Sequence, residues 1–194
     1  MKQQMLTSLD LFHYHLKKAN EHLKEESFLK FTEEKDKKEA KRKAWKIDIY
    51  LDKIRSTHNI GSIFRTCEAL QLGRIVSSSS FIDFEHSQIK KTAMGAWDWV
   101  EWEKINNLEE LKRPIIALET CSNANSLYDY IFPESFSLVL GNEEYGVSKK
   151  ILEQADDVIY IPMEGRKNSL NVANAFSMVA GEIVRQRSRV KVWN

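Results

Sequence analysis

The chain has 194 residues, of which 42% are hydrophobic and 29% are charged, and its 29 Lys and Arg side chains nearly balance 28 Asp and Glu side chains. This composition fits one globular domain with a short appendage, and it excludes the collagen-like, disordered and disulfide-scaffold classes. No run of 18 apolar residues occurs, and charges interrupt the N-terminal segment where a signal peptide has a continuous apolar stretch. We therefore expect a cytoplasmic protein without a membrane span.

The cysteines and histidines do not form a metal or redox pattern. Cys67 and Cys121 have no Cys or His neighbour at metal-ligand spacing, and two cysteines do not make a disulfide framework. His13 and His15 are two positions apart, which places them on different faces of a helix. Neither G-x-G-x-x-G nor G-x-x-x-x-G-K-[ST] is present. We predict reduced thiols, no metal, no Rossmann dinucleotide site and no P-loop.

Residues 1–45 contain no Gly or Pro and many strong helix formers, which predicts a helical extension separate from the rest of the chain. Between Lys30 and Lys46, eight basic residues outnumber four acidic ones. Such a charge run is either the solvated face of a helix or a contact for RNA phosphates, and the sequence leaves both open. The candidate RNA contacts are Lys41, Arg42 and Lys43.

Strand-like and helix-like segments alternate after Trp45. Short apolar runs predict strands, and amphipathic stretches predict helices. In chain order the predicted elements are strand Ile47–Leu51, helix Ile60–Leu70, strand Ile75–Val76, helix Ser87–Met94, strands Trp99–Trp102, Ile115–Leu118 and Ser137–Leu140, helix Lys149–Gln154, strand Val158–Ile161 and helix Asn171–Arg187. This alternation predicts an α/β fold with a parallel sheet.

The last predicted helix carries an apolar stripe. Its members recur at helical spacing on one face: Val172, Ala175, Phe176, Val179 and Ile183. A stripe of this kind packs either on the sheet or on a partner subunit. On a chain of this size the stripe leads us to predict a dimer contact through this helix and part of the helix of the first motif.

Three segments combine glycine with polar side chains, each beside an apolar strand-like run. They read NIGSIFRTCEA from Asn59, LVLGNEEYGVS from Leu138 and IPMEGRKNSLNVA from Ile161. Open α/β sheets bind ligands at the carboxyl ends of their strands, so these segments form the candidate site. In this order they resemble the three motifs of the SpoU, or TrmH-type, ribose methyltransferases of the SPOUT class. The resemblance runs from Ile47 to Arg187.

The resemblance implies a trefoil-knotted α/β domain, here residues 46–194, that binds S-adenosylmethionine and acts as a homodimer. It implies methyl transfer to the 2′-hydroxyl of a ribose in tRNA or rRNA. The alternative is a non-catalytic RNA-binding or scaffold protein that has kept the fold. Neither composition nor periodicity predicts the knot, because threaded chains are rare among folds.

The resemblance also implies roles for particular residues. Arg65 would be the catalytic residue at the reacting ribose, and four further positions match the family's site: Asn59, Glu143, Ser169 and Asn171. We expect the Arg65 guanidinium to bind a phosphate and stabilise a developing 2′-alkoxide, since its high pKa makes it a poor base. A routine ion pair of Arg65 and a helix-capping role of Ser169 are the structural alternatives.

For the cofactor, the resemblance implies that backbone groups of Gly141, Ile161 and Leu170 hold the adenine and ribose. Apolar packing would come from Leu118, Met163 and Leu170. For Leu118 and Met163, a place in the hydrophobic core is an equally good interpretation. Backbone groups suit adenine because they bind its edge without ordering long side chains.

Overall fold

A computed structural model of the protein describes residues 44–78, 81–166 and 169–187. The predicted helical extension and its Lys41, Arg42 and Lys43 lie outside the described residues. Within the described ranges, no helix combines the length and apolar character needed to cross a membrane.

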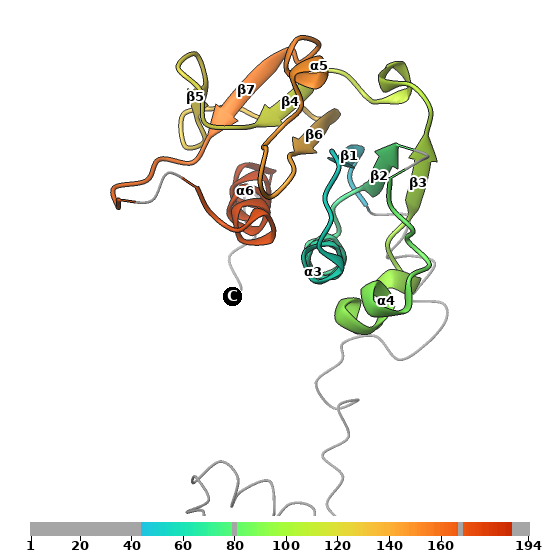
Figure 1. The fold of residues 1–194 in the computed structure, drawn as a ribbon. Coiled ribbons are helices and arrows are strands. Elements are labelled where there is room, and N and C mark those ends of the chain that lie inside the picture. Colours follow the sequence, from blue (N-terminus) through green and yellow to red (C-terminus); the bar gives the residue numbers. More distant parts are fainter. Residues whose placement is uncertain (1–43, 79–80, 167–168, 188–194) are drawn as a thin grey trace, which may run out of the picture. The chain divides into compact units, whose positions relative to one another are not determined.

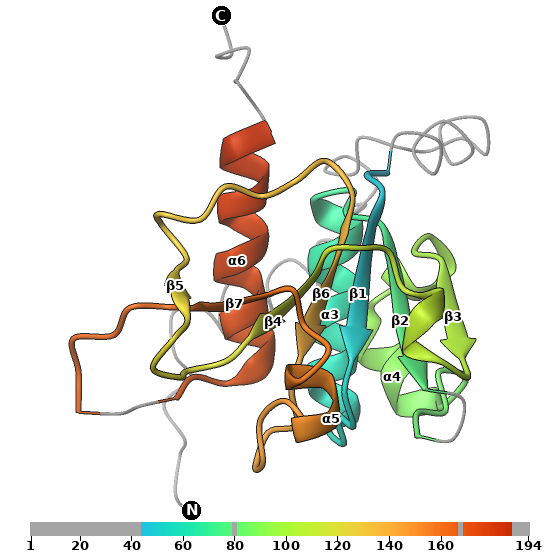
Figure 2. The same ribbon diagram turned by 90° about the horizontal axis from the view of Figure 1, so that it is seen from above.

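Seven strands form one sheet in which every pairing is parallel, as the alternating pattern predicted (Figures 1 and 2). The strand order across the sheet is β3-β2-β1-β6-β4-β7-β5. In chain order the strands are β1 (Ile47–Leu51), β2 (Arg74–Ser78), β3 (Trp102–Ile105), β4 (Ile115–Leu118), β5 (Asn125–Ser126), β6 (Phe136–Leu140) and β7 (Asp157–Tyr160). The central strands are buried over their whole length, which is typical of a parallel sheet covered on both faces.

Three helices cover one face of this sheet: α3 (Thr57–Ala69), α4 (Ser87–Ala93) and α6 (Val172–Arg187) (Figure 1). The short helix α5 (Lys149–Leu152) and the 3₁₀ turn η3 (Leu108–Glu110) pack on the opposite face. Side chains of β1 alternate between these two layers. Ile49 and Leu51 join the larger core beneath the helices, whereas Tyr50 joins the smaller cluster beside α5.

The apolar stripe of α6 faces the chain's own core. Phe176, Val179 and Ile183 have no exposed surface and pack in the cluster that also contains α3 and the sheet. The stripe therefore does not form the dimer contact, because it is already covered within one chain, and the dimer through this helix and α3 stays a prediction. The outward face of α6 carries other residues, among them Met178, which is 41% exposed.

The predicted strand Trp99–Trp102 is also wrong in its placement. A 3₁₀ turn, η2 (Ala96–Asp98), precedes it, and the strand begins only at Trp102. Gly95 adopts a φ of 87° before this turn, and the Trp97 indole N–H donates to the Phe84 carbonyl at 3.0 Å. Trp97 and Trp102 rings lie 5.9 Å apart. The apolar character of this segment thus reflects an aromatic cluster rather than one continuous strand.

The amino edge of the sheet contains a buried ion-pair cluster. Asp48 of β1 has no exposed surface, and its carboxylate accepts a hydrogen bond from Arg74 Nε at 2.8 Å. The Lys112 ammonium binds the same carboxylate, and the Lys112 backbone N–H donates to it at 3.2 Å. Arg74 also pairs with the exposed Glu103. Burial alone raises the pKa of Asp48, but the hydrogen bonds and charges of Arg74 and Lys112 outweigh it and hold this pKa below its usual value.

Candidate functional site

The three motif segments meet at the carboxyl edge of the sheet. Helix α3 begins six residues after β1, the loop Gly141–Ser148 follows β6, and the segment from Ile161 leads from β7 to α6. In a parallel sheet the strands all end at one edge, and the returning helices begin there. The amino ends of α3 and α6 therefore lie beside the loop that follows β6 (Figure 2).

A hydrogen-bond network joins one residue from each motif. The Asn59 amide donates through Nδ2 to Glu143 Oε1 at 2.9 Å. The Asn59 Oδ1 atom accepts from Asn171 Nδ2, also at 2.9 Å. These three predicted site residues are 84 and 112 positions apart along the chain, yet they form one continuous set of contacts.

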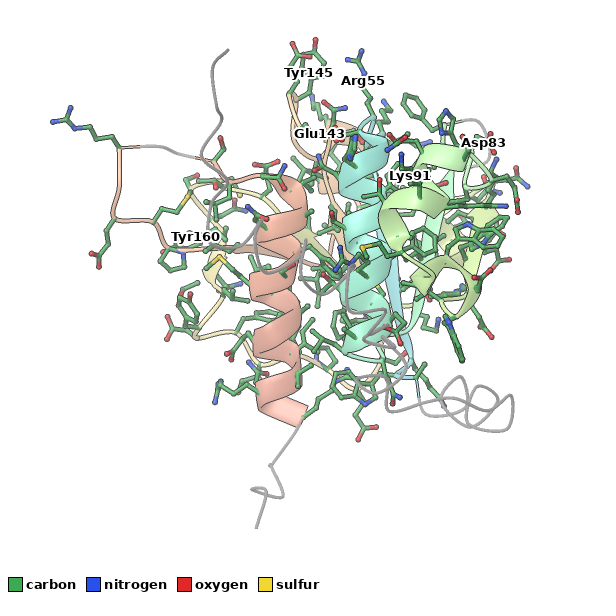
Figure 3. The ribbon with its side chains drawn as sticks, turned by 90° about the horizontal axis from the view of Figure 1, so that it is seen from below. Arg55, Asp83, Lys91, Glu143, Tyr145 and Tyr160 are labelled. Carbon is green, nitrogen blue, oxygen red and sulfur yellow. The ribbon has the colours of Figure 1, made fainter. Side chains whose placement is uncertain are left out.

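The Glu143 carboxylate sits at the amino end of α3, where the backbone N–H groups of Arg55 and Ser56 donate to it at 3.2 and 3.1 Å. Figure 3 shows Glu143, Arg55 and Tyr145 at this end of the molecule. Partial burial alone raises the pKa of Glu143. The hydrogen bonds from the Asn59 amide and from backbone N–H groups lower this pKa by more, so it lies below its usual value. The carboxylate is therefore ionised at neutral pH and held by neutral donors.

Hydrogen bonds within the loop Gly141–Ser148 and to Lys53 fix its conformation. Asn142 and Gly146 exchange two backbone hydrogen bonds of 2.9 Å, and the Asn142 amide donates to the Lys53 carbonyl at 2.7 Å. A methyl group on Gly141 would come within 2.3 Å of the backbone of Gly146 and Val147, so only glycine fits there. Gly146 has a φ of 69°, which also favours glycine.

Two carboxylates that the sequence analysis did not identify anchor this loop. The Val147 backbone N–H donates to Glu119 at 2.8 Å, and the Ser148 backbone N–H donates to Asp52 at 2.6 Å. Asp52 directly follows β1 and Glu119 directly follows β4. An acidic residue immediately after an apolar strand was the sequence signal that could have identified both anchors.

Arg65 lies on the exposed side of α3, six positions after Asn59. Its guanidinium makes no hydrogen bond or ion pair with any residue of the described part of the chain. The routine ion pair considered from the sequence is therefore not observed in that part. At 1.5 Å per residue, Arg65 is about 9 Å along the helix axis from Asn59, so it does not join the Glu143–Asn59–Asn171 network.

Helix α6 is capped by Asn171, not by Ser169. Asn171 Oδ1 accepts from the backbone N–H groups of Ala173 and Asn174 at 3.0 and 3.2 Å. The same side chain thus caps α6 and donates to Asn59. Ser169 is exposed and makes no hydrogen bond with the described residues, so its hydroxyl is available to a ligand.

The predicted cofactor residues lie at the ends of three neighbouring strands. Leu118 ends β4, Gly141 follows β6 and Ile161 follows β7, and these strands are adjacent in the order β6-β4-β7. Gly141 and Ile161 are buried and Leu170 is exposed. The backbone groups of Ile161 and Leu170 make no hydrogen bond with the rest of the described chain. Buried backbone groups without partners indicate a place where a ligand supplies the hydrogen bonds.

The apolar members of this set differ in exposure. Ile161 belongs to the main core, and Leu118 packs against it with part of its surface exposed. Met163 is also partly exposed, and Leu170 is 44% exposed. Side chains that combine core contacts with an open surface can pack against an adenine ring on one side of the strand ends.

The fold places the three motif segments at the carboxyl edge of a parallel sheet, which is where open α/β sheets bind ligands. Residues 46–181 match the model of the SpoU rRNA Methylase family, and the chain belongs to this family. The match includes the three motifs and ends within α6.

Known proteins agree with this assignment. The chain is 32% identical over 152 residues to a tRNA (guanosine(18)-2′-O)-methyltransferase of Aquifex aeolicus, covering 72% of this chain and 69% of that protein. It spans 58% to 64% of the lengths of four other curated relatives.

Among solved structures, the A. aeolicus TrmH/SpoU tRNA modifying enzyme superposes with a TM-score of 0.69 at 30% identity, covering 80% of this chain and 84% of that one. The SpoU methyltransferase AviRb of Streptomyces viridochromogenes, solved with AdoMet, has a TM-score of 0.66 at 22% identity, covering 76% and 60%. The second likeness concerns the fold alone.

Proposed function

We propose that the protein is an S-adenosylmethionine-dependent RNA methyltransferase that acts on a ribose 2′-hydroxyl. The observation that carries this proposal is the joining of all three motifs at one sheet edge through Glu143, Asn59 and Asn171. A scaffold that had only kept the fold would have no need to keep this polar network together with an unpaired arginine on the adjoining helix.

S-adenosylmethionine fits the residues at the ends of β4, β6 and β7. Backbone groups of Gly141, Ile161 and Leu170 would bind the adenosine, and Leu118 and Met163 would pack against it. When bound, the cofactor supplies an electrophilic methyl group on a sulfonium. The negative charges of Glu143 and Glu119 at the same edge favour a cationic ligand there.

Arg65 is the group that we assign to the RNA backbone. Its planar guanidinium can bind a phosphate beside the target ribose through two parallel hydrogen bonds. A positive charge at this place also stabilises the 2′-oxygen as it becomes negative during methyl transfer. Asn59 and Asn171 are positioning residues that fix the amino ends of α3 and α6. Ser169 has a free hydroxyl beside Asn171 and would bind the substrate or cofactor.

A homodimer and a trefoil knot belong to the same proposal. The knot is supported by the path of the chain: β6 inserts between β1 and β4, and the segment after β7 returns to place α6 beside α3. The outer faces of α3 and α6 carry exposed residues such as Ala69, Met178 and Gly181, which suit close helix packing between two copies. Sedimentation velocity of Met178→Glu against the unaltered protein tests this surface, and we expect a shift towards monomer.

The proposed domain division and location follow from this activity. Residues 46–194 would form the methyltransferase domain, and residues 1–45 would form a basic extension whose Lys41, Arg42 and Lys43 contact RNA. For such an enzyme we propose a cytoplasmic location. The family is named for rRNA methylation, whereas the A. aeolicus relative is named for guanosine 18 of tRNA, so we propose a structured RNA of either class.

Methyl transfer is tested directly by incubating the purified full chain with labelled S-adenosylmethionine and either tRNA or rRNA. Nucleoside digests analysed by mass spectrometry should contain a labelled 2′-O-methylnucleoside. A label on a base, or none with either RNA, would contradict the proposed reaction. The scaffold alternative predicts RNA binding without any labelled nucleoside.

A further inference from the structure

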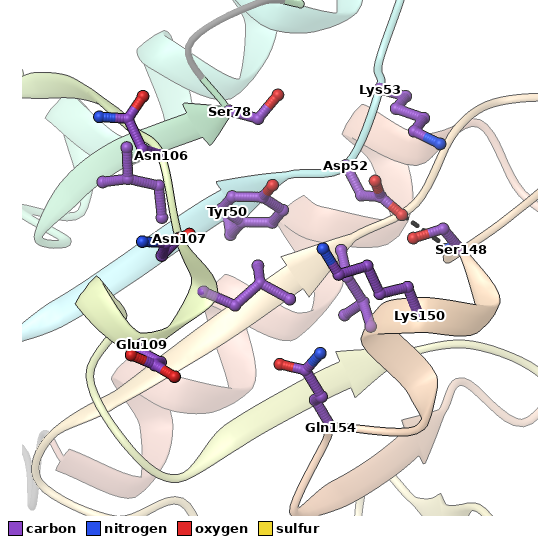
Figure 4. A pocket seen from close by; sticks show the side chains of 13 residues that line it. Tyr50, Asp52, Lys53, Ser78, Asn106, Asn107, Glu109, Ser148, Lys150 and Gln154 are labelled. Carbon is purple, nitrogen blue, oxygen red and sulfur yellow. Dashed lines mark hydrogen bonds between the residues drawn. The ribbon is translucent and has the colours of Figure 1, made fainter.

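A cavity lies on the other face of the sheet from α3 and α6. It has a volume of about 430 Å³ and opens on the face of the sheet that α5 and η3 cover, opposite α3, α4 and α6 (Figure 4). The size lies in the range of small-ligand sites in proteins. Its walls come from the ends of β1, β2 and β3, from η3 and from α5.

One side of this cavity is apolar and the other can form hydrogen bonds. Tyr50, Leu108 and Ile151 contribute an aromatic ring and two aliphatic side chains. Asn107 and Gln154 contribute amides, which both donate and accept. This combination of a flat apolar surface with amide groups matches the faces and edges of a nucleobase.

Two lysines line the same cavity without a carboxylate partner. Lys53 and Lys150 form no ion pair with any residue in the described ranges. Lys53 has a φ of 56°, a left-handed conformation that is uncommon for a residue with a long side chain. Its backbone is held there because its carbonyl accepts the 2.7 Å hydrogen bond from Asn142.

The two acidic groups of the cavity, Asp52 and Glu109, form no ion pair with these lysines in the described part of the chain. Asp52 is only 3% exposed, and its carboxylate is engaged by the Ser148 backbone N–H. Glu109 is exposed to solvent. Burial and the nearby Asp52 raise the pKa of Tyr50 to about 12, so its hydroxyl is a neutral donor. The cavity therefore offers two lysines without an ion-pair partner among the described residues and one neutral phenol.

We propose that this cavity binds one nucleotide of the RNA substrate, with its base against Tyr50, Leu108 and Ile151 and its phosphate on Lys53 and Lys150. The assignment of RNA as the source of the nucleotide rests on the proposed function. The cavity adds a contact that lies on the opposite face of the sheet from Arg65. An RNA bound at both places would span the carboxyl edge.

The cavity is also tied to the motif loop. Lys53 and Ser148 line the cavity. The Lys53 carbonyl accepts a hydrogen bond from Asn142 of the loop, and the Ser148 backbone N–H donates to Asp52. The loop that presents Glu143 to α3 thus forms part of the wall of the nucleotide site. Occupancy of the cavity would fix the RNA relative to the network that positions Asn59.

The test measures binding of a short fluorescein-labelled single-stranded RNA to the full chain in the absence of S-adenosylmethionine. The test variant is Lys53→Asn with Lys150→Gln, because asparagine tolerates the left-handed conformation at position 53. The matched control is Lys104→Gln with Lys149→Gln, which removes the same charge from neighbouring positions that do not line the cavity. Circular dichroism verifies that both variants are folded.

We expect the test variant to bind the RNA about tenfold more weakly, and its log–log salt slope to be shallower by about 0.7, the value for one phosphate of a single strand. The control should change affinity by less than about threefold, because its charges lie outside the contact. Leu108→Ala should weaken binding about threefold without changing the slope, since it removes only apolar contact.

Competition identifies the ligand. The four ribonucleoside 5′-monophosphates should displace the RNA, and inorganic phosphate at equal concentration should not. Equal binding by the test and control variants would overturn the proposal, as would equal competition by phosphate. Nucleotide binding without RNA binding would overturn the assignment to RNA. Methyl transfer is measured separately, so a failure of the proposed reaction leaves this binding result distinguishable.

Discussion

The two edges of the sheet hold carboxylates in opposite ways. At the amino edge, Asp48 is bound by the cations of Arg74 and Lys112. At the carboxyl edge, Glu143 and Asp52 are bound by backbone N–H groups, with an amide added at Glu143. Asp52 and Glu119 anchor the Gly141–Ser148 loop at that edge. Neither carboxylate forms an ion pair with Lys or Arg in the described residues.

The difference separates a structural use of charge from a functional one. Arg74 and Lys112 both bind the buried carboxylate of Asp48 and are therefore not available to a ligand. Neutral donors hold the carboxylates at the other edge, and Arg65 has no ion-pair partner among the described residues. Its charge is therefore available to the RNA phosphate that we propose.

The largest expected effect concerns the free cation. Arg65→Ala should lower turnover by about a hundredfold or more, the scale for loss of one preorganised donor, with cofactor affinity little changed. Arg65→Lys should restore only part of the rate, because lysine lacks the planar fork. Single-turnover methylation assays and calorimetry with the cofactor measure the two quantities.

The control for this variant lies at the other edge. Arg113→Ala removes an exposed arginine that pairs with Asp156 at 3.1 Å. Its turnover should remain within about twofold of the unaltered protein, since surface pairs contribute little. A wild-type rate for Arg65→Ala would show that the cation at the functional edge has no part in the reaction.

The second effect is on stability at the amino edge. Asp48→Asn should lower the free energy of unfolding by about 3 kcal/mol, because Arg74 and Lys112 lose their shared counter-charge in a partly buried place. Urea denaturation measures this change. Glu103→Gln is the control, since Glu103 is exposed and its loss should cost less than about 1 kcal/mol.

A smaller effect on stability is expected from the equivalent change at the carboxyl edge. Glu143→Gln leaves no cation unpaired, so the free energy of unfolding should fall by only about 1 kcal/mol. Turnover should fall about tenfold, because glutamine has one acceptor oxygen where Glu143 uses two. Its NH2 group cannot accept from the Arg55 N–H and displaces the oxygen that orients Asn59. Glu144→Gln, which removes only a 3.8 Å surface contact with Arg55, should leave both quantities unchanged. A larger loss of stability for Glu143→Gln than for Asp48→Asn would reverse the comparison.

The smallest effect is a dependence of stability on acid. The folded-state pKa values of Asp48 and Glu143 lie below their usual values of 3.8 and 4.5. Their contribution is therefore complete above those usual values and is lost as the pH falls through the lower, folded-state values. The urea concentration at the unfolding midpoint, measured from pH 7 downward, should decrease once the pH is below about 4. The fall should be shallower in Asp48→Asn and in Glu143→Gln.

The sequence predicted the parts of the site that side-chain identity defines. Asn59, Glu143 and Asn171 were identified because their motifs recur in a known order, and the structure joins them. Asp52 and Glu119 were missed because their partners are backbone N–H groups of a loop. Such donors have no sequence signature, so only the folded path of the loop shows which carboxylates they meet.

The fold class was predictable for a different reason. The run Ile115–Leu118 matches its strand without error, because a strand inside a parallel sheet is largely buried and mostly apolar. The two-residue strand β5 (Asn125–Ser126) has no such pattern, since it lies at the sheet edge and its residues are polar. The stripe of α6 was visible, but the surface that it packs against depends on tertiary arrangement.

The double role of Asn171 has a consequence for the order in which the protein assembles. Its side chain caps α6 and completes the contact with Asn59, and α6 is made after every strand of the sheet. A nascent chain can therefore pair its strands before it possesses a finished site. The last helix must dock beside α3 before the network exists, so long-range closure limits how early activity can arise during synthesis.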